Sequence, residues 1–206
     1  MNKLLIAVSL CSCSLAFAQA PSGKAATPPP GKPTTPPSGA AAAPAEMTPP
    51  KPGPDQEALK PFVRSGSYTG TRMSPDGKEM PQKGKQTCKW LPGGMWASCD
   101  IDMTAGTGKT ATKWMGHLVF GYDTMAKGYR AVMTDNFGMM GRMKGTLDGK
   151  KMVWESMDEM KVPNMPSKER VTDDATDAKA EKMTFEGYMN GKWMPMGSGE
   201  FKGGGK

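Results

Sequence analysis

The sequence contains little that would support catalysis. His117 is its only histidine, and it lies in an alternating segment typical of a β-strand. A single imidazole excludes a multi-histidine metal site, and no Gly-x-Ser-x-Gly turn is present to supply a serine nucleophile. A paired-carboxylate envelope hydrolase is therefore the lowest-ranked alternative. We expect a protein that is not an enzyme and that needs no cofactor.

Cysteine is also scarce, with four residues in the chain. Cys11 and Cys13 lie near the N-terminus, where Lys3 precedes an apolar run and small residues recur at alternate positions. This pattern predicts a signal peptide over residues 1–20 and a periplasmic or secreted protein, and the run is too short for a transmembrane segment. In the alternative interpretation the run ends in a lipoprotein cleavage box, and Cys13 carries a lipid anchor.

Large apolar side chains are nearly absent from residues 21–54, which consist mainly of Pro, Ala, Gly, Thr and Lys. Such a segment has little to bury, so we predict a disordered, partly extended linker. The formal net charge of the chain is +7. This charge permits loose contact with an anionic cell envelope, whereas an exported location excludes nucleic acid as a partner.

After the linker, no long helical pattern is present, and period-two alternation takes over. Turn signals such as Asp148-Gly149 and Asn190-Gly191 separate the alternating segments. Residues 55–203 are therefore predicted to form one all-β domain of about nine or ten antiparallel strands, either a closed barrel or a sandwich. A short helix capped by Asp55 is expected to precede the strands and to close one end of the core.

The segment from Cys88 to Cys99 predicts a β-hairpin closed by its own disulfide. Gly93-Gly94 marks the turn, and Pro92 has no N–H to close a two-residue loop. A four-residue loop, Pro92–Met95, avoids this conflict. It makes the two cysteines a directly opposed, non-hydrogen-bonded pair, in which side chains approach most closely.

Methionine is the one residue in clear excess, with 20 in the chain. Beyond residue 20 the only leucines are Leu59, Leu91, Leu118 and Leu147, and the only isoleucine is Ile101. Methionine is therefore expected to be the main aliphatic filler of the core. The alternative is a periplasmic protein that binds Cu(I) or buffers oxidants, because soft thioethers prefer soft metals. The candidates for that role are Met139, Met140, Met143, Met157 and Met160.

Three segments carry a family resemblance: Gly116–Asp123 with its Gly-Tyr-Asp end, the Tyr-led strand in Gly128–Val132, and the Gly-x-x-Asp-Gly hairpin in Gly145–Lys150. Together they resemble the bacterial domain of unknown function 1579 family, over roughly residues 55–199. The resemblance implies a lipocalin-like, up-and-down antiparallel β-barrel and implies no activity. Tyr68 departs from the family pattern, which has tryptophan at this position in the first strand.

A barrel of this size either fills its interior with side chains or holds one small ligand there. We expect an exported, non-enzymatic barrel protein that binds a small apolar ligand in its interior. The residues expected to line that interior are Trp90, Trp114, Phe120, Met133 and Trp154.

Overall fold

The computed structural model describes residues 50–74, 77–162, 165–177 and 179–203. All of them belong to one compact unit. The predicted signal peptide, including Cys13, lies outside the described residues, as does the predicted linker up to residue 49.

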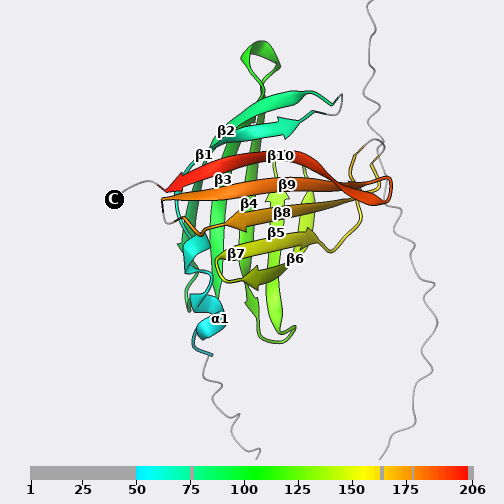
Figure 1. Cartoon of the computed structure of the whole chain (residues 1–206). Coiled ribbons are helices and arrows are strands. Elements are labelled where there is room, and N and C mark those ends of the chain that lie inside the picture. Colours follow the sequence, from blue (N-terminus) through cyan, green and yellow to red (C-terminus); the bar gives the residue numbers. More distant parts are fainter. Residues whose placement is uncertain (1–49, 75–76, 163–164, 178, 204–206) are drawn as a thin grey trace, which may run out of the picture. The chain divides into compact units, whose positions relative to one another are not determined.

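Ten antiparallel strands close into a barrel in which each strand pairs with its neighbours in the sequence and β1 pairs with β10 (Figure 1). This confirms the predicted all-β, up-and-down barrel. The elements are α1 (Pro54–Glu57), η1 (Lys60–Phe62), β1 (Gly66–Met73), β2 (Glu79–Trp90), β3 (Trp96–Ala105), η2 (Gly108–Thr110), β4 (Thr112–Asp123), β5 (Gly128–Asp135), β6 (Met140–Asp148), β7 (Lys151–Ser156), β8 (Lys168–Asp174), β9 (Ala180–Met189) and β10 (Lys192–Gly203).

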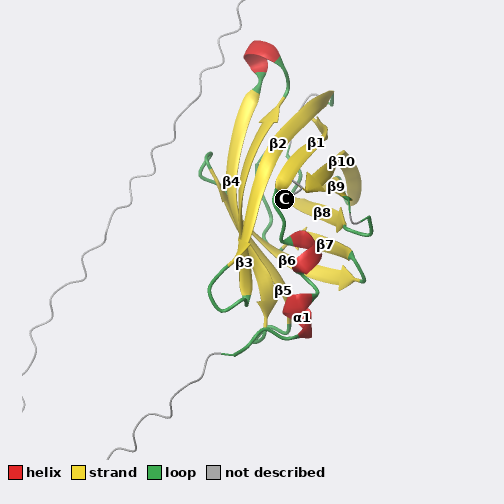
Figure 2. Ribbon diagram, turned by 90° about the vertical axis from the view of Figure 1, so that its left-hand side faces the viewer, coloured by secondary structure: helices red, strands yellow, loops and turns green. Residues whose placement is uncertain are grey.

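The barrel is flattened into two layers. In Figure 1, β8 to β10 run across the view in front of β3 to β5, which run along it. Figure 2 shows α1 and η1 at the lower end, while the β3–β4 connection with η2 projects from the opposite end. The two ends of the barrel are therefore built differently.

The β2–β3 hairpin has the geometry predicted from its sequence. Leu91 N–H donates to the Trp96 carbonyl at 2.8 Å, so Pro92–Met95 form the four-residue loop. Cys88 and Cys99 are opposed in the register, their Cα atoms are 4.0 Å apart, and their sulfurs are bonded. The predicted disulfide is confirmed, and it ties the two strands together close to their turn.

The helical segment before β1 closes one end of the barrel. Leu59 is completely buried and Phe62 nearly so, and both belong to the hydrophobic core. The prediction that Asp55 caps the helix is wrong, because Gly53 is the N-cap residue. Pro54 suits the first helical position, and the Gln56 side chain accepts a hydrogen bond from Gly53 N–H at 2.8 Å, so the helix begins earlier than expected.

Candidate functional site

The strand register shows which side chains point into the barrel, and the two ends of the barrel divide this interior into two halves. Residues on one face of each strand point inwards, and the disulfide identifies that face on β2 and β3. We call the end covered by α1 and η1 the closed half. The open half lies at the other end, where the strands connect through η2 and through residues 136–139 and 157–167.

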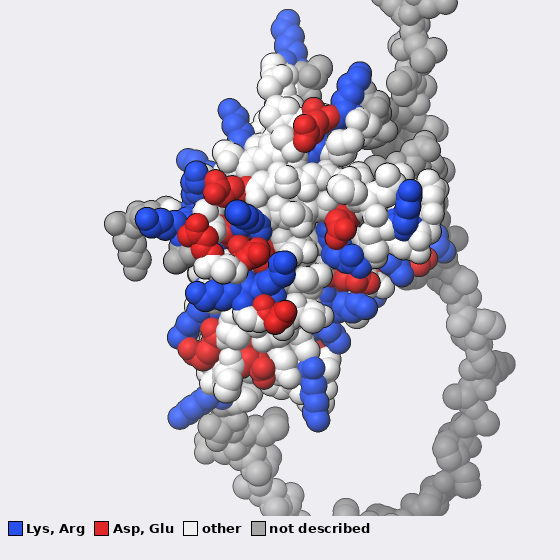
Figure 3. Space-filling view, in the orientation of Figure 1, with Lys and Arg blue, Asp and Glu red and all other residues white. Residues whose placement is uncertain are grey.

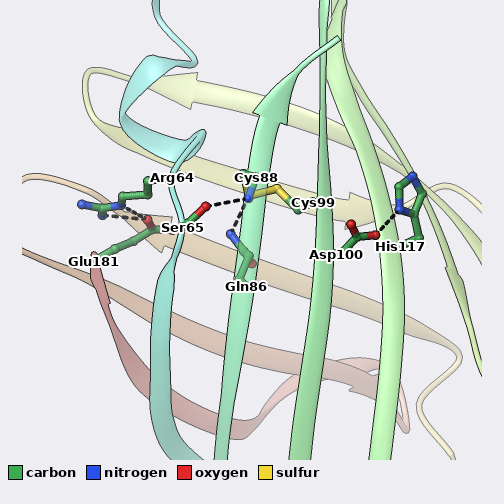
Figure 4. The surroundings of a disulfide bond; sticks show 8 residues. All are labelled: Arg64, Ser65, Gln86, Cys88, Cys99, Asp100, His117 and Glu181. Atoms are coloured by element: carbon green, nitrogen blue, oxygen red, sulfur yellow. Dashed lines mark hydrogen bonds and ion pairs between the residues drawn. A yellow bond between two sulfur atoms is a disulfide. The ribbon is translucent and has the colours of Figure 1, made fainter. Parts of the chain in front are cut away.

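The closed half is packed with apolar side chains. Its core comprises Leu59, Phe62, Ala97, Cys99, Phe120, Ala131, Met152, Trp154 and Ala175. Phe120 and Trp154 meet edge to face with ring centroids 6.0 Å apart, a favoured aromatic arrangement. The disulfide belongs to this half, and Figure 4 shows Ser65 accepting a hydrogen bond from Cys88 N–H at 3.0 Å. Apolar packing and the disulfide therefore stabilise this end of the barrel.

The closed half also buries a charged cluster. Arg64 donates two hydrogen bonds, at 3.0 and 2.7 Å, to one carboxylate oxygen of Glu181 (Figure 4). Asp173 points inwards beside them, and its Oδ1 has no hydrogen-bond partner among the described residues. Burial and the negative charge of Glu181 raise the pKa of Asp173 well above its ordinary value. Burial also raises the pKa of Glu181, although Arg64 opposes that shift.

In the open half, apolar side chains face inwards but stay partly exposed. The register places these residues on the same inner face as the core, yet none is fully buried. They are Met80, Met103, Trp114, Met133 and Phe185, and Met143 lies at the boundary because it also packs against the core of the closed half. This half of the interior therefore has apolar surface that the protein itself does not cover. Covering that surface with another apolar molecule would be favourable, because apolar groups gain stability by leaving water.

Two aromatic rings lie along the inner wall, each over a neighbouring glycine. A Cβ on Gly116 would come within 2.4 Å of the Trp114 ring, and one on Gly145 within 2.7 Å of the Trp154 ring. Gly141, an inward position on β6 in the open half, is different because a Cβ there would meet nothing within 4 Å. The two rings thus cover Gly116 and Gly145, whereas the space beside Gly141 is unfilled.

Polar groups in the open half bind one another. Trp114 Nε1–H donates to Asp135 at 3.0 Å, and the other oxygen of Asp135 accepts from two backbone N–H groups of the following turn. Arg72 donates to Glu169 at 3.1 Å. With these groups paired, the surface left facing the interior is mainly apolar.

Tyr68 lies between the two halves. Its ring meets Phe185 edge to face at 6.3 Å, and it covers Gly199 on the neighbouring strand. Its hydroxyl is buried with no partner among the described residues, and burial raises its pKa to about 12. The position at which this chain departs from the family pattern therefore carries an unpaired polar atom inside the barrel.

All five residues predicted to line the interior lie at inward positions of the register, but they do not form one site. Phe120 and Trp154 are part of the packed core, whereas Trp114 and Met133 lie in the open half. Trp90 lies at the closed end and lines a small cleft of about 180 Å³ beside α1.

Sequence reasoning missed Met80, Met103, Met143 and Phe185 as lining residues of the open half, and it missed the Arg64 cluster. Alternation could have identified the inward methionines, because each lies an even number of positions from another inward residue. No such signal marks Arg64, which lies outside the strands and 117 residues from its partner Glu181.

The methionines proposed for Cu(I) gather near the open end but on different faces. Met139, Met140 and Met157 are exposed, and Met160 is partly so, while Met143 faces the interior. Within the part of the chain that the structure describes, no group of three or more His, Cys, Asp or Glu side chains could hold a metal ion. His117 lies on the outer face of β4, with Nδ1 2.7 Å from Asp100 Oδ1 (Figure 4).

Charges of both signs mix on the outer surface. Figure 3 shows Lys and Arg side chains interspersed with Asp and Glu on the face that it presents. Examples are Arg170 with Glu186 and Lys144 with Glu155. A second cleft, of about 290 Å³, lies near the open end beside η2 and is lined by residues that include Gln82, Lys83 and Thr104. Neither this cleft nor the smaller one gathers a catalytic set of side chains.

Comparisons with known proteins identify a family and a fold. The family model described as "Protein of unknown function (DUF1579)" matches residues 52–202. The crystal structure of Rv2717c from M. tuberculosis is similar, with a TM-score of 0.51 and 8% sequence identity over 74% of this chain and 99% of that one. At this identity the likeness concerns the fold alone. No curated protein matches the chain. Among the described residues, no helix is long and apolar enough to cross a membrane.

Proposed function

This chain belongs to the DUF1579 family, whose function is unknown, and we propose that it is a non-enzymatic binding protein that holds a small apolar ligand in the open half of its barrel. The contrast between the two halves of the interior supports the proposal. The closed half fills itself, whereas the open half has inward apolar side chains that remain partly exposed.

The unfilled space beside Gly141 carries the argument furthest. Protein interiors are normally packed as tightly as organic crystals, whereas a Cβ on Gly141 would face open space, with no atom within 4 Å apart from its chain neighbours. Met133 pairs directly with Gly141, and Met143 lies two positions further along the same face of β6, so flexible thioethers that suit an apolar guest flank the space. Since the nearby charged groups are paired, the guest needs no charge of its own.

We also propose that the protein is exported. The predicted signal peptide and the disulfide between Cys88 and Cys99 support this, because disulfides form and persist in oxidising compartments. Cleavage within residues 1–20 would leave a soluble protein, and lipidation of Cys13 would leave an anchored one. The mass of the protein purified from its host distinguishes these two forms.

The test is binding of N-phenyl-1-naphthylamine, an uncharged apolar fluorophore that brightens when it leaves water. We expect saturable brightening with the purified protein. Gly141→Leu places an apolar side chain in the unfilled space and should weaken binding about tenfold or more, equivalent to about 1.4 kcal/mol. The matched control is Thr146→Leu, which adds a similar side chain to the exposed outer face of the same strand. Equal binding by the two variants, or no binding by the wild type, would overturn the proposal.

Cu(I) binding or oxidant buffering by Met139, Met140, Met143, Met157 and Met160 remains the second candidate. The exposure of Met139, Met140 and Met157 at one end of the barrel favours it. Native mass spectrometry of the protein purified from its host would detect an apolar ligand, a copper ion or oxidised thioethers as different mass increments. A copper adduct that is lost when Met139, Met140 and Met157 are replaced by Leu would support this candidate over the ligand carrier.

A further inference from the structure

Exposed apolar side chains concentrate at the open end of the barrel. The described part of the chain has ten large hydrophobic side chains that are exposed, and eight of them lie at this end. Six come from the β5–β6 and β7–β8 connections and the strand ends beside them, and we call these six the apolar rim. They are Phe137, Met139, Met140, Met157, Val162 and Met165.

The two connections that carry the rim are held side by side by the strands between them. Met157 N–H donates to the carbonyl of Arg142 on β6, so the start of the β7–β8 connection lies beside the strand that the β5–β6 turn leads into. The β5–β6 turn also contacts β4, where Asn136 N–H donates to the carbonyl of Met115, itself exposed. The β5–β6 turn and Met157 are therefore held together, Val162 and Met165 follow in the same β7–β8 connection, and Phe137 and Met140 are the most exposed members of the rim, at 61% and 67%.

The charges of the β7–β8 connection and its ion-pair partners are net positive. The acidic groups of the β7–β8 connection are neutralised, since Asp158 pairs with Arg142, and Glu159 pairs with Lys168 at 3.3 Å. Lys161 lies between these acids and Val162, and Lys192 precedes the exposed Met194. Among the described residues, neither lysine has an ion pair, and both are exposed. An exposed apolar surface with uncompensated lysines is complementary to an anionic lipid surface.

The composition of the rim suits a lipid surface. The rim consists of Met, Phe and Val, whose apolar side chains can be buried at the boundary between headgroups and acyl chains. Flexible thioethers adapt to a fluid acyl-chain boundary without a defined pocket. Exposed apolar patches on soluble proteins mark interaction sites, and this one lies at the end where the inward apolar side chains stay partly exposed.

We propose that the apolar rim docks the open end of the barrel onto an anionic lipid bilayer, so that an apolar ligand passes between the membrane and the barrel interior. The docking stands on the rim and its lysines, while the transfer of ligand rests on the proposed function. Phe137 and the rim methionines insert at the headgroup level, and the lysines contact lipid phosphates.

The test is flotation of the purified full chain with vesicles of phosphatidylcholine and phosphatidylglycerol in a two-to-one ratio. We expect the wild type to float with these vesicles, and to do so less as salt concentration rises. The variant Phe137→Ser/Met140→Ser/Val162→Ser should lower the affinity about tenfold or more. The matched control is Met125→Ser/Val132→Ser, which removes exposed apolar side chains outside the rim and should bind as the wild type does.

Several outcomes would overturn the docking proposal. The wild type could fail to float, or the rim variant could float as well as the wild type, which would assign binding to the lysines of residues 21–54. Light scattering could instead show that the wild type is a dimer and the rim variant a monomer. In that case a second copy of the chain covers the rim. Circular dichroism and thermal unfolding establish that the rim variant is folded, so that a loss of flotation reports on the rim.

The two proposals fail separately. The rim variant should keep its binding of N-phenyl-1-naphthylamine, because its substitutions lie outside the barrel interior. Gly141→Leu should keep flotation, because its side chain faces inwards. Loss of flotation in Gly141→Leu would show that docking depends on the interior and would overturn the assignment to the rim.

Discussion

The closed and open halves of this barrel share the same strands but use their inward positions differently. In the closed half, alternation delivers Ala97, Cys99 and Met152 to a core with almost no exposure, and a helical segment that carries Leu59 covers the end. In the open half, the same alternation delivers methionines and Trp114 to positions that stay partly exposed. A closed barrel can therefore separate a packed core from a partly exposed lining along its axis without dividing into two domains.

The largest expected effect concerns the ion pairs of the two halves. Arg64 and Glu181 have side chains only 19% and 9% exposed, whereas Arg72 and Glu169 are 40% and 31% exposed. Arg64→Ala leaves Glu181 buried without its partner and should lower the free energy of unfolding by about 3–5 kcal/mol. Arg72→Ala in the open half should cost about 0–1 kcal/mol. Urea unfolding measures both, and equal losses would contradict the division into a stabilising half and a binding half.

The disulfide provides the next largest effect. Cys88→Ala/Cys99→Ala should lower the free energy of unfolding by about 2–3 kcal/mol, because the bridge restricts the unfolded chain over a separation of 11 residues. Unfolding of the wild type with and without a thiol reductant is the control, and reduction should reproduce most of the loss. Since the bridge lies in the closed half, binding of N-phenyl-1-naphthylamine by the folded variant should be unchanged.

Asp173 is expected to make stability depend on pH. Its raised pKa means that the folded protein holds a proton that the unfolded chain releases above about pH 3.9. The contribution of Asp173 to the free energy of unfolding is therefore fully present below that pH, and it falls as the pH rises towards the raised pKa. Asp173→Asn keeps the shape without the charge and should raise the free energy of unfolding at pH 7 by about 1–2 kcal/mol.

The pH dependence supplies the control for that variant. Unfolding curves between acidic and neutral pH should show a clear decline for the wild type and a smaller one for Asp173→Asn, with the rest coming from Glu181. A decline in the wild type that is no steeper than the decline in Asp173→Asn would show that Asp173 is charged in the fold.

The smallest effect is expected where the halves meet. Tyr68→Phe removes a buried hydroxyl that has no partner among the described residues, so the free energy of unfolding should stay constant or rise by less than about 1 kcal/mol. Tyr129→Phe is the comparison, because the Tyr129 hydroxyl donates to the Asp55 carbonyl at 3.3 Å. It should destabilise by about 0.5–1 kcal/mol. Destabilisation by Tyr68→Phe of more than this would show that its hydroxyl has a partner, such as an ordered water.

Local features were predictable from the sequence. Alternation and turn residues predicted the strands, and the missing N–H of Pro92 predicted the loop that places Cys88 opposite Cys99. The family resemblance favoured a barrel over a sandwich. The strand and hairpin predictions succeeded because each depends on residues close together in the chain.

The candidate site was less predictable because it depends on contacts between distant segments. From the sequence, Trp114 and Phe120 were predicted to line the same site, yet they belong to different halves. The halves differ because Leu59 and Phe62, which precede the strands, cover only one end of the barrel. Gly141 gave no signal, because the space beside it exists only after β5, β6 and β7 are paired. The irregularity in β10 between Pro195 and Gly197 was also invisible.

The pairing that closes the barrel has a consequence for how the chain folds. Gly66 in β1 pairs with Gly203 in β10, so the last hydrogen-bonded ladder joins the two ends of the domain. Until β10 has been synthesised, both β1 and β9 expose unpaired edges, which are templates for aggregation. Contacts of such long sequence separation also slow folding. Under the proposed export this delay is useful, because the barrel cannot close before its final strand has been made and the chain stays unfolded for translocation.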